Sequence, residues 1–269
     1  MQKNVLPIGI FDSGMGGLTV FRELVSLLPH ESYVYLGDTA RLPYGTKSSA
    51  TIIRYALQMA RVLVEQNVKL MVIACNTATT AALSYLQAQL PDLAILGVVE
   101  PAAQMAVCAT RNHRIGVLAT EATVKSCVYP TFIQRMNPEI QVFQHSCGLF
   151  VALAEEGCID DEVARAAVKK YLAPMVQSTE LCDTLLLGCT HFPVLLKSIR
   201  AVLGEGIEIV DSAKATAHAV YTLLQQKNLF NTGPTQDARF LITDLPERFV
   251  RVGEIFLGRP IDANSVHLM

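Results

Sequence analysis

The sequence has few of the features that nucleic-acid-binding, membrane or secreted proteins need. Lys and Arg number 22 against 24 Asp and Glu, the formal net charge is -2, and no basic run stands out, so the electrostatic footprint of a nucleic-acid-binding protein is absent. No apolar stretch reaches the roughly 18 to 20 residues of a membrane span. Residues 1–11 show no long apolar region or cleavage site of a secretory signal. We therefore expect a cytoplasmic protein that works without a membrane or a nucleic acid.

The seven cysteines lack the pattern of a disulfide-rich protein, because their number is odd and no two are spaced as CxxC. Reduced thiols are the state we expect. The 269 residues, 51% of them hydrophobic and 17% charged, suffice for one large α/β domain or for two domains of about 100 to 150 residues each.

The stretch around Cys75 is the most informative part of the chain. Residues 70–74 are apolar without alternation, which is typical of a parallel strand buried on both faces. The strand ends at Cys75, and we expect a helix to begin near Thr77. Ligands of open parallel sheets bind at the carboxyl ends of strands, and a helix N-terminus favours a thiolate. Cys75 is therefore a candidate reactive thiol.

A second stretch repeats this arrangement. An apolar strand starting at Thr184 ends before Cys189, and Pro193 suits the first turn of the helix that follows. Two such units predict two thiols that face one cleft. Strands expected at residues 7–11, 33–36, 70–74 and 95–98 recur in the same order at 114–118, 140–143, 184–187 and 207–210, which indicates an internal duplication.

Most cysteines in proteins act as small buried hydrophobes. Five of the seven are assigned this structural role: Cys108, Cys127, Cys147, Cys158 and Cys182. A zinc site is one alternative for the other two, but Cys189 and His191 are one residue apart and lack standard ligand spacing, so we expect no metal. A protease-like Cys-His pair is another alternative, and it would leave the second thiol unexplained.

Two thiols on opposite faces of a small substrate suit inversion of a stereocentre. One thiolate would take a proton from carbon and the other thiol would deliver one to the opposite face, provided that helix termini and hydrogen bonds bring their pKa towards neutrality. Asp12, at the end of the first strand, and His191, beside the second cysteine, are candidate partners for these protons. Asp12 taken alone could instead cap the following helix.

The glycines at positions 14, 16 and 17 do not complete a nucleotide-binding motif. Position 19 is a threonine where G-x-G-x-x-G needs glycine, and the GTKS run at residues 45–48 lacks the adjacent Gly-Lys of a P-loop. What remains is a glycine-rich turn at a helix N-terminus, which can approach a carboxylate or a phosphate. Ser13, Asn76, Thr77 and Thr190 add hydroxyl and amide groups around such an anion, although helix capping explains each of them as well.

Four segments resemble the bacterial glutamate racemase family: GIFDSGMGGL at residues 9–18, GDTARLPYG at 37–45, ACNTAT at 74–79 and LGCTHFP at 187–193. They occur in order in both halves, so the resemblance covers nearly the whole chain. Together the four motifs are highly specific, whereas any one alone would be a weak signal.

The resemblance implies cofactor-independent interconversion of L- and D-glutamate, which supplies D-glutamate for peptidoglycan, by a homodimer. Cys75 would take the α-proton from the D-enantiomer and Cys189 from the L-enantiomer, with Asp12 and His191 assisting. Matching positions would bind the substrate through Asp12, Ser13, Tyr44, Gly45, Asn76, Thr77, Thr120, Thr190 and His191.

With the resemblance included, we predict two flavodoxin-like α/β domains, each a doubly wound parallel sheet, related by pseudo-symmetry with the active site in the cleft between them. The first, residues 1–98 plus 211–269, carries Asp12 and Cys75. It includes the C-terminal tail, which has no counterpart in the first half and is expected to pack back on it. The second, residues 99–210, carries Cys189 and His191.

The chain departs from the family's pattern at residues 147–153. The family tends to have a proline-bearing CPLFVPL run, whereas this chain has CGLFVAL, with Gly148 and Ala152 in place of the prolines. This leaves open the role of Glu155, an acidic residue expected near the cleft. The chain also lacks the N-terminal extension of family members that a cell-wall nucleotide precursor activates, and we expect no regulation of that type.

Three other functions stay open at this point. An aspartate or hydantoin racemase of the same superfamily would use the same two thiols with a different pocket. A non-catalytic module that binds an acidic ligand or a protein partner would leave both thiols without a task, and so would a pyridoxal-dependent enzyme. A preference for another amino acid would identify the first, and any steady turnover would exclude the second.

Overall fold

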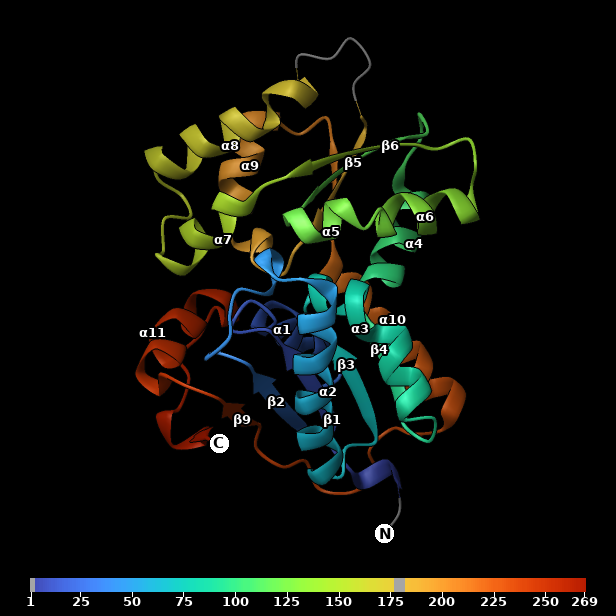
Figure 1. Cartoon of the computed structure of the whole chain (residues 1–269), viewed down its shortest axis with the longest axis vertical. Coiled ribbons are helices and arrows are strands. Elements are labelled where there is room, and N and C mark those ends of the chain that lie inside the picture. The colour runs from blue at the N-terminus through green and yellow to red at the C-terminus, as the bar shows by residue number, and fades with distance from the viewer. Residues whose placement is uncertain (1–2, 177–181) are drawn as a thin grey trace.

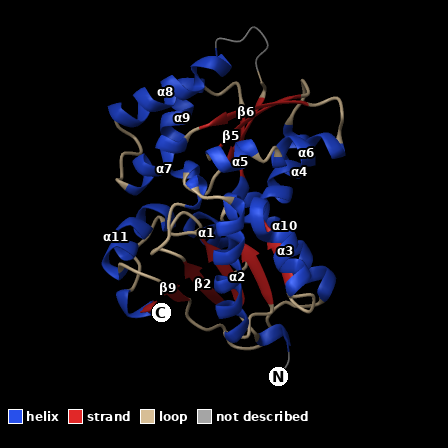
Figure 2. Ribbon diagram, in the orientation of Figure 1, coloured by secondary structure: helices blue, strands red, loops and turns tan. Residues whose placement is uncertain are grey.

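Two parallel β-sheets, one above the other in Figure 1, form the framework of this computed structural model. The structure describes residues 3–176 and 182–269. The larger sheet has six strands in the order β10-β9-β2-β1-β3-β4, and the smaller has four in the order β6-β5-β7-β8. Helices flank the strands of both sheets (Figure 2). The predicted fold class, two doubly wound parallel sheets, is therefore confirmed.

The first part of the chain builds most of the larger sheet. Its strands are β1 (Ile8–Asp12), β2 (Tyr33–Gly37), β3 (Leu70–Ile73) and β4 (Ala94–Gly97). The helices between them are α1 (Leu18–Leu27), α2 (Ser49–Glu65) and α3 (Asn76–Gln89). Ser48 caps α2 by accepting a hydrogen bond from the Thr51 N–H.

The middle part of the chain builds the smaller sheet. Its strands are β5 (Arg114–Ala119), β6 (Gln141–Ser146), β7 (Thr184–Gly188) and β8 (Glu208–Asp211). Its helices are α4 (Val99–Ala109), α5 (Glu121–Lys125), α6 (Val128–Met136), α7 (Gly148–Glu155), α8 (Glu162–Val176) and α9 (Leu196–Leu203). The order β6-β5-β7-β8 repeats the order β2-β1-β3-β4, which supports the predicted duplication.

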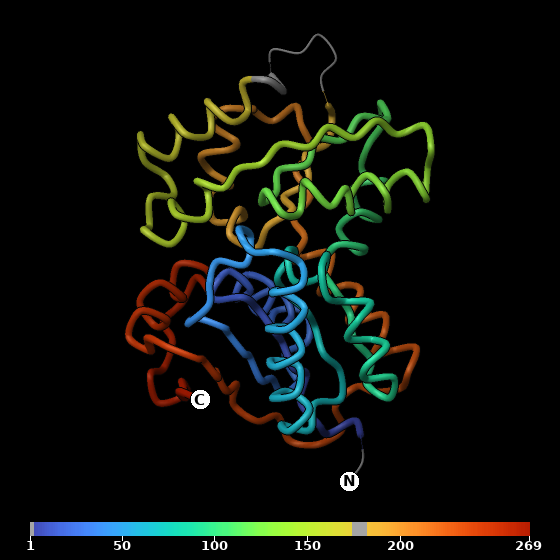
Figure 3. Tube along the Cα trace, in the orientation of Figure 1, coloured from blue at the N-terminus to red at the C-terminus, as the bar shows by residue number. Residues whose placement is uncertain are grey.

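The C-terminal tail returns to the larger sheet. After α10 (Ser212–Lys227) come β9 (Arg239–Ile242), α11 (Pro246–Leu257) and β10 (Val266–Leu268). In Figure 3 the orange-to-red part of the trace comes back beside the blue part, and β9 pairs with β2 in parallel. The tail packs where we expected it, while the exact limits of the two domains stay a prediction.

The helices α4 to α8 and the strand β10 were not anticipated from the sequence. Glu100 and Pro101 lie in the first turn of α4, where a proline is tolerated. β10 is a three-residue strand at the sheet edge, next to β9, and two of its residues are exposed, so it carries little hydrophobic pattern.

The larger sheet is covered on both faces, which is why its strands are continuous apolar runs. On one face Ile8 and Ile10 pack in a core with buried residues of α1, α10 and α11. On the other face Phe11 and Ile73 pack with α2 and α3. Alternate residues of each strand thus serve two cores.

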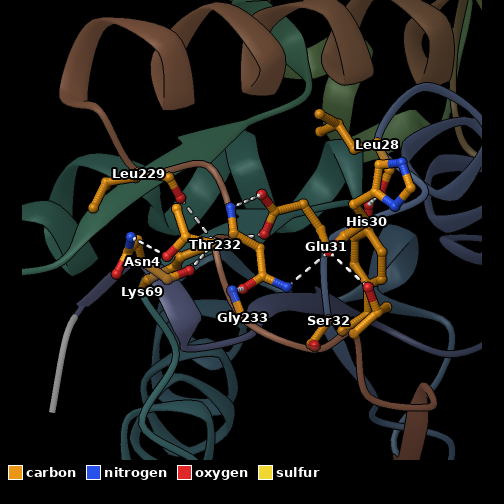
Figure 4. A network of polar contacts seen from close by, with 12 residues as sticks. Asn4, Leu28, His30, Glu31, Ser32, Lys69, Leu229, Thr232 and Gly233 are labelled. Carbon is orange, nitrogen blue, oxygen red and sulfur yellow. Dashed lines mark hydrogen bonds and ion pairs between the residues drawn. The ribbon is translucent and has the colours of Figure 1, made fainter.

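A buried ion pair holds the start of the tail against the end of this sheet that is remote from Cys75 (Figure 4). Lys69, just before β3, is fully buried, and its Nζ lies 2.5 Å from Oε2 of Glu31. The same ammonium donates to the carbonyls of Asn4 at 2.7 Å and Leu229 at 2.8 Å. Oε1 of Glu31 accepts from the Asn231 N–H at 2.8 Å.

Removing one member of this pair should destabilise the fold strongly. In Glu31→Gln the buried ammonium loses its counter-charge, and we expect the free energy of unfolding in urea to fall by about 3 to 5 kcal/mol. The double variant Glu31→Gln, Lys69→Met should lose less than Glu31→Gln alone, because no unpaired charge remains.

The exposed Glu121–Lys125 pair provides the matched control. Glu121→Gln removes a carboxylate whose side chain is 61% exposed, so little effect on unfolding is expected. If Glu31→Gln destabilised the protein no more than Glu121→Gln, the buried pair would not have the role assigned to it.

Candidate active site

The carboxyl ends of the two sheets meet, and they bring the candidate residues together. Thr77, just after β3, has its Oγ1 2.9 Å from Oγ1 of Thr120, which follows β5. Thr19 Oγ1, in the first turn of α1, donates to the Thr190 carbonyl, just after β7, at 3.1 Å. The site therefore lies where ligands of open parallel sheets bind, shared between the two sheets.

A glycine makes this approach of the two sheets possible. A Cβ at Gly16 would lie 2.3 Å from Nδ1 of His191 and 2.7 Å from Oγ1 of Thr190. No larger side chain fits there unless the side chains of His191 and Thr190 shift. That the glycine-rich turn approaches an anion stays a prediction, while Gly16 itself packs against His191 and Thr190.

Cys75 lies beside Asp12 because β1 and β3 are adjacent strands. Cys75 is 6% exposed and is the N-cap of α3, its Sγ accepting a hydrogen bond from the Ala78 N–H at 3.4 Å. Asp12 is fully buried, and its Oδ2 accepts from the Gly14 N–H at 2.9 Å. It caps the turn before α1 in this way, while its Oδ1 has no hydrogen-bond partner among the described residues.

The environment of Cys75 favours the thiol over the thiolate. Burial raises the pKa of Cys75 to about 12, and the charge of Asp12 acts in the same direction. Hydrogen bonds from Ser13 and Ala78 lower this pKa, but by less. Burial also raises the pKa of Asp12 itself. The condition that helix termini and hydrogen bonds bring the pKa towards neutrality is not met at Cys75, because burial raises this pKa by more than the hydrogen bonds to sulfur lower it.

Cys189 has a different set of partners. It follows β7, is 6% exposed, and its Sγ lies 3.9 Å from Nδ1 of His191. Nε2 of the same ring lies 3.2 Å from Oε1 of Glu155 in α7. Oε2 of Glu155 accepts from Nη2 of Arg248 in α11 at 3.0 Å. These contacts form one chain from Cys189 to the C-terminal tail.

This chain of contacts keeps His191 positively charged. Burial alone would lower the pKa of His191, but hydrogen bonds and charge interactions with Cys189 and Glu155 raise it to about 10. The pKa of Glu155 is held below its ordinary value by His191 and Arg248, in spite of burial. An imidazolium at this distance from Sγ is placed to stabilise negative charge on that sulfur. Glu155 thus contacts His191 even though Gly148 and Ala152 replace the prolines of the family pattern.

Asn76, the first residue of α3, is oriented by a tyrosine from α6. The hydroxyl of Tyr129 donates to Oδ1 of Asn76 at 2.6 Å, so the Nδ2 group points elsewhere, and it has no partner among the described residues. Thr123 adds a hydroxyl 3.4 Å from that of Thr77. Sequence reasoning missed Thr123 and Tyr129, since a fully buried tyrosine in a helix shows the same pattern as a core residue.

The loop after β2 carries Tyr44 and Gly45 to the same place. The hydroxyl of Tyr44 donates to Oδ2 of Asp38, which is fully buried and whose Oδ1 accepts from Nε of Arg41 at 2.8 Å. A Cβ at Gly45 would lie 3.0 Å from Cβ of Thr120. Beside this contact is a cavity of about 310 Å³ whose lining includes Gly45, Thr120 and Glu155.

All seven cysteines are free thiols. Cys147 and Cys182 are buried and Cys158 is half-buried, whereas Cys108 and Cys127 are exposed. The structural interpretation as buried hydrophobes is therefore wrong for Cys108 and Cys127, which lie at the end of α4 and in the turn between α5 and α6.

Within residues 3–176 and 182–269, no three His, Cys, Asp or Glu side chains are grouped so that they could hold a metal ion. None of the helices in the same residues has the length and apolar character required to cross a membrane.

Known proteins resemble this chain along its whole length. Residues 8–220 match the family model described as Asp/Glu/Hydantoin racemase. A glutamate racemase from Geobacter metallireducens is 46% identical over 93% of this chain and 92% of its own length. The crystal structure of glutamate racemase from Francisella tularensis in complex with D-glutamate has a TM-score of 0.91 at 36% identity and covers 99% of this chain and 98% of its own.

A third comparison is with Escherichia coli glutamate racemase, in complex with L-glutamate and the activator UDP-MurNAc-ala. Its TM-score is 0.79 at 34% identity, over 93% of this chain and 95% of its own. Both the family model and the relatives cover far more than half of the chain. The protein is therefore a member of the Asp/Glu/Hydantoin racemase family.

Proposed function

We propose that this protein is a glutamate racemase, which interconverts L- and D-glutamate with two thiols and no cofactor and so supplies D-glutamate for peptidoglycan. The observation that carries the proposal is the pair Cys75 and Cys189, which are buried at the facing carboxyl ends of two sheets. Cys75 lies beside the carboxyl group of Asp12, and Cys189 lies beside the imidazole of His191. Relatives at 41 to 46% identity that are glutamate racemases support glutamate over aspartate or a hydantoin as the substrate.

Two polar groups without partners suit the common part of an amino acid. Oδ1 of Asp12 can accept from an α-ammonium, and Nδ2 of Asn76 can donate to an α-carboxylate. Both atoms are buried, so each would be costly to leave unpaired. Ser13, Thr77 and Thr190 would complete the binding of this end of the substrate, with Thr120 and His191 beside them.

The side-chain carboxylate of glutamate would lie against the loop of Tyr44 and Gly45. Because the Tyr44 hydroxyl is committed to Asp38, the main-chain N–H groups of this loop are the donors that remain to bind it. Asp38, Arg41 and Thr243 fix the loop by hydrogen bonds, so the donors would be held in place before the substrate arrives.

The reaction divides between the two thiols. With L-glutamate, the Cys189 thiolate removes the α-proton, the S–H bond forms, and the electron pair of the C–H bond moves into the substrate carboxylate. Cys75, a thiol at neutral pH, then gives its proton to the opposite face. The products are D-glutamate, a Cys75 thiolate and a Cys189 thiol, which is the arrangement that the reverse reaction needs. The charge of His191 would stabilise Cys189 when it is a thiolate.

The first test follows L-glutamate in deuterated buffer without added cofactor, by circular dichroism and mass spectrometry. Wild type should lose optical rotation and incorporate α-deuterium, while Cys75→Ser and Cys189→Ser should each be slower by at least about 100-fold, since each lacks one proton-transfer group. Cys108→Ser, at an exposed thiol, is the control and should match wild type.

Two results would contradict the proposal in different ways. Rotation that decays for aspartate or a hydantoin, but not for glutamate, would move the substrate assignment within the family. No turnover of any of these compounds would refute the enzymatic function, and a non-catalytic binding module would be the hypothesis that remains.

The charge of His191 is a second point for measurement. Histidine-ring NMR should show one residue that titrates near pH 10 rather than near 6.5, and His191→Asn should remove its signal. Glu155→Gln should shift this titration to lower pH, since the neutral amide no longer stabilises the imidazolium. Because the pKa is raised on folding, the contribution of His191 to stability is complete below about pH 6.5 and disappears as the pH rises through about 10. Titration of the His191 signal near pH 6.5 in wild type would contradict the ion pair between His191 and Glu155.

We also propose that the protein is a cytoplasmic homodimer, as the family resemblance implies. The seven free thiols support a reducing compartment. Light scattering on the protein recovered from cytosolic extract of its native cells should give twice the monomer mass. Recovery in the cell-envelope fraction would contradict the cytoplasmic location. A monomer mass at working concentration would contradict the homodimer.

A further inference from the structure

The two thiols are supported unequally. The residues that influence Cys75 most closely, Asp12, Ser13 and Ala78, come from the elements of the larger sheet around it. His191, beside Cys189, is contacted instead by the C-terminal helix α11, which has no counterpart in the other half. One contact is direct, an edge-to-face packing with Phe256 at 4.9 Å between ring centroids. The other passes through Glu155 to Arg248.

The two α11 residues form one face of that helix. Arg248 and Phe256 are eight residues apart, so they are separated by about two turns, or roughly 12 Å along the axis. Glu155 and His191 fill the space opposite this face. Helix α11 therefore contacts both the His191 ring, through Phe256, and its partner Glu155, through Arg248. The helix belongs to the C-terminal tail and not to the sheet that carries Cys189.

We propose that Arg248 is a positioning residue for proton transfer at Cys189. It holds Glu155 by one carboxylate oxygen, so that the other oxygen faces Nε2 of His191 and the ring presents Nδ1 to Sγ of Cys189. The proposal rests on the racemase function proposed above, and it adds a residue that does not touch the substrate.

The geometry favours this role over an ordinary surface ion pair. The carboxylate of Glu155 is only 10% exposed, and its two oxygens have separate partners, at 3.0 Å and 3.2 Å. Arg248 is 32% exposed, and its second acidic neighbour, Glu156, lies farther away at 3.8 Å and is 69% exposed. The ionisable groups that face His191 are thus Glu155, Asp12 and Cys189, and those that face Arg248 are Glu155 and Glu156.

A merely structural tether between the two halves is the competing explanation, and steady-state rates cannot separate it from positioning. Enantiomers have equal free energies, so kcat/KM must be the same in both directions for every variant. Kinetic isotope effects escape this constraint, because the α-deuterium of L-glutamate is taken by Cys189 and that of D-glutamate by Cys75.

The experiment measures initial rates with L- and D-glutamate deuterated at the α-carbon. Arg248→Ala should lower kcat/KM by about 10- to 100-fold, because a displacement of His191 by up to about 1 Å has an effect of this size on proton transfer. Slower transfer at Cys189 alone should raise the isotope effect on kcat/KM for L-glutamate, while that for D-glutamate falls towards its equilibrium value. Arg248→Lys should recover part of the rate, because it keeps the charge but lacks the planar fork of donors.

Arg251→Ala is the matched control, since Arg251 is an exposed arginine on the same helix. It should leave the rate and both isotope effects as in wild type. The proposal is overturned if Arg248→Ala changes the two isotope effects equally, or slows the reaction no more than Arg251→Ala. If Arg248→Ala does not fold, Arg248→Lys and Glu155→Gln provide the same comparison of isotope effects.

The outcome also distinguishes this proposal from the function on which it rests. A wild-type protein without turnover or isotope effects would refute the racemase function. A wild-type protein with isotope effects on both enantiomers, together with an Arg248→Ala variant that leaves them unchanged, would refute only the role of Arg248.

Discussion

The close approach of two sheet ends is the constraint on which the site depends. Inversion at carbon needs acid and base on opposite sides of one atom, and a single sheet presents its strand ends from one side only. The contacts Thr77–Thr120 and Thr19–Thr190, together with the missing side chain of Gly16, bring a second sheet within hydrogen-bonding distance. The duplicated strand order supplies that second sheet with a thiol at the matching position.

The neighbours of the two thiols differ, although the strands that carry them and the burial of the two cysteines are alike. Both sulfurs are almost completely removed from water. Cys75 shares its surroundings with a carboxylate and stays protonated, whereas Cys189 lies beside an imidazolium that Glu155 keeps charged. The two thiols thus have neighbours of opposite charge, which come from the surrounding elements and not from the cysteines themselves.

The sequence was informative where function follows from local pattern. Strand, cysteine and helix start are consecutive in the chain, so Cys75, Cys189 and the doubled architecture could be predicted. What depends on tertiary contacts could not be predicted: Tyr129 and Arg248 reach the site from distant segments, and burial outweighs the effect of the α3 terminus on the pKa of Cys75. Exposure of Cys108 and Cys127 was missed because composition does not say which face of an element meets water.

The attachment of α11 has a mechanical consequence. Its flanks are fixed to the larger sheet, by β9 on β2 and β10 on β9, so the helix moves with that sheet. Glu155 and His191 move with the other sheet. A motion that separated the two sheets would therefore also separate Arg248 from Glu155 and Phe256 from His191. Access to the site and the charge interactions of His191 would thus change together. His191 would have all of its partners only when the two sheets are close together.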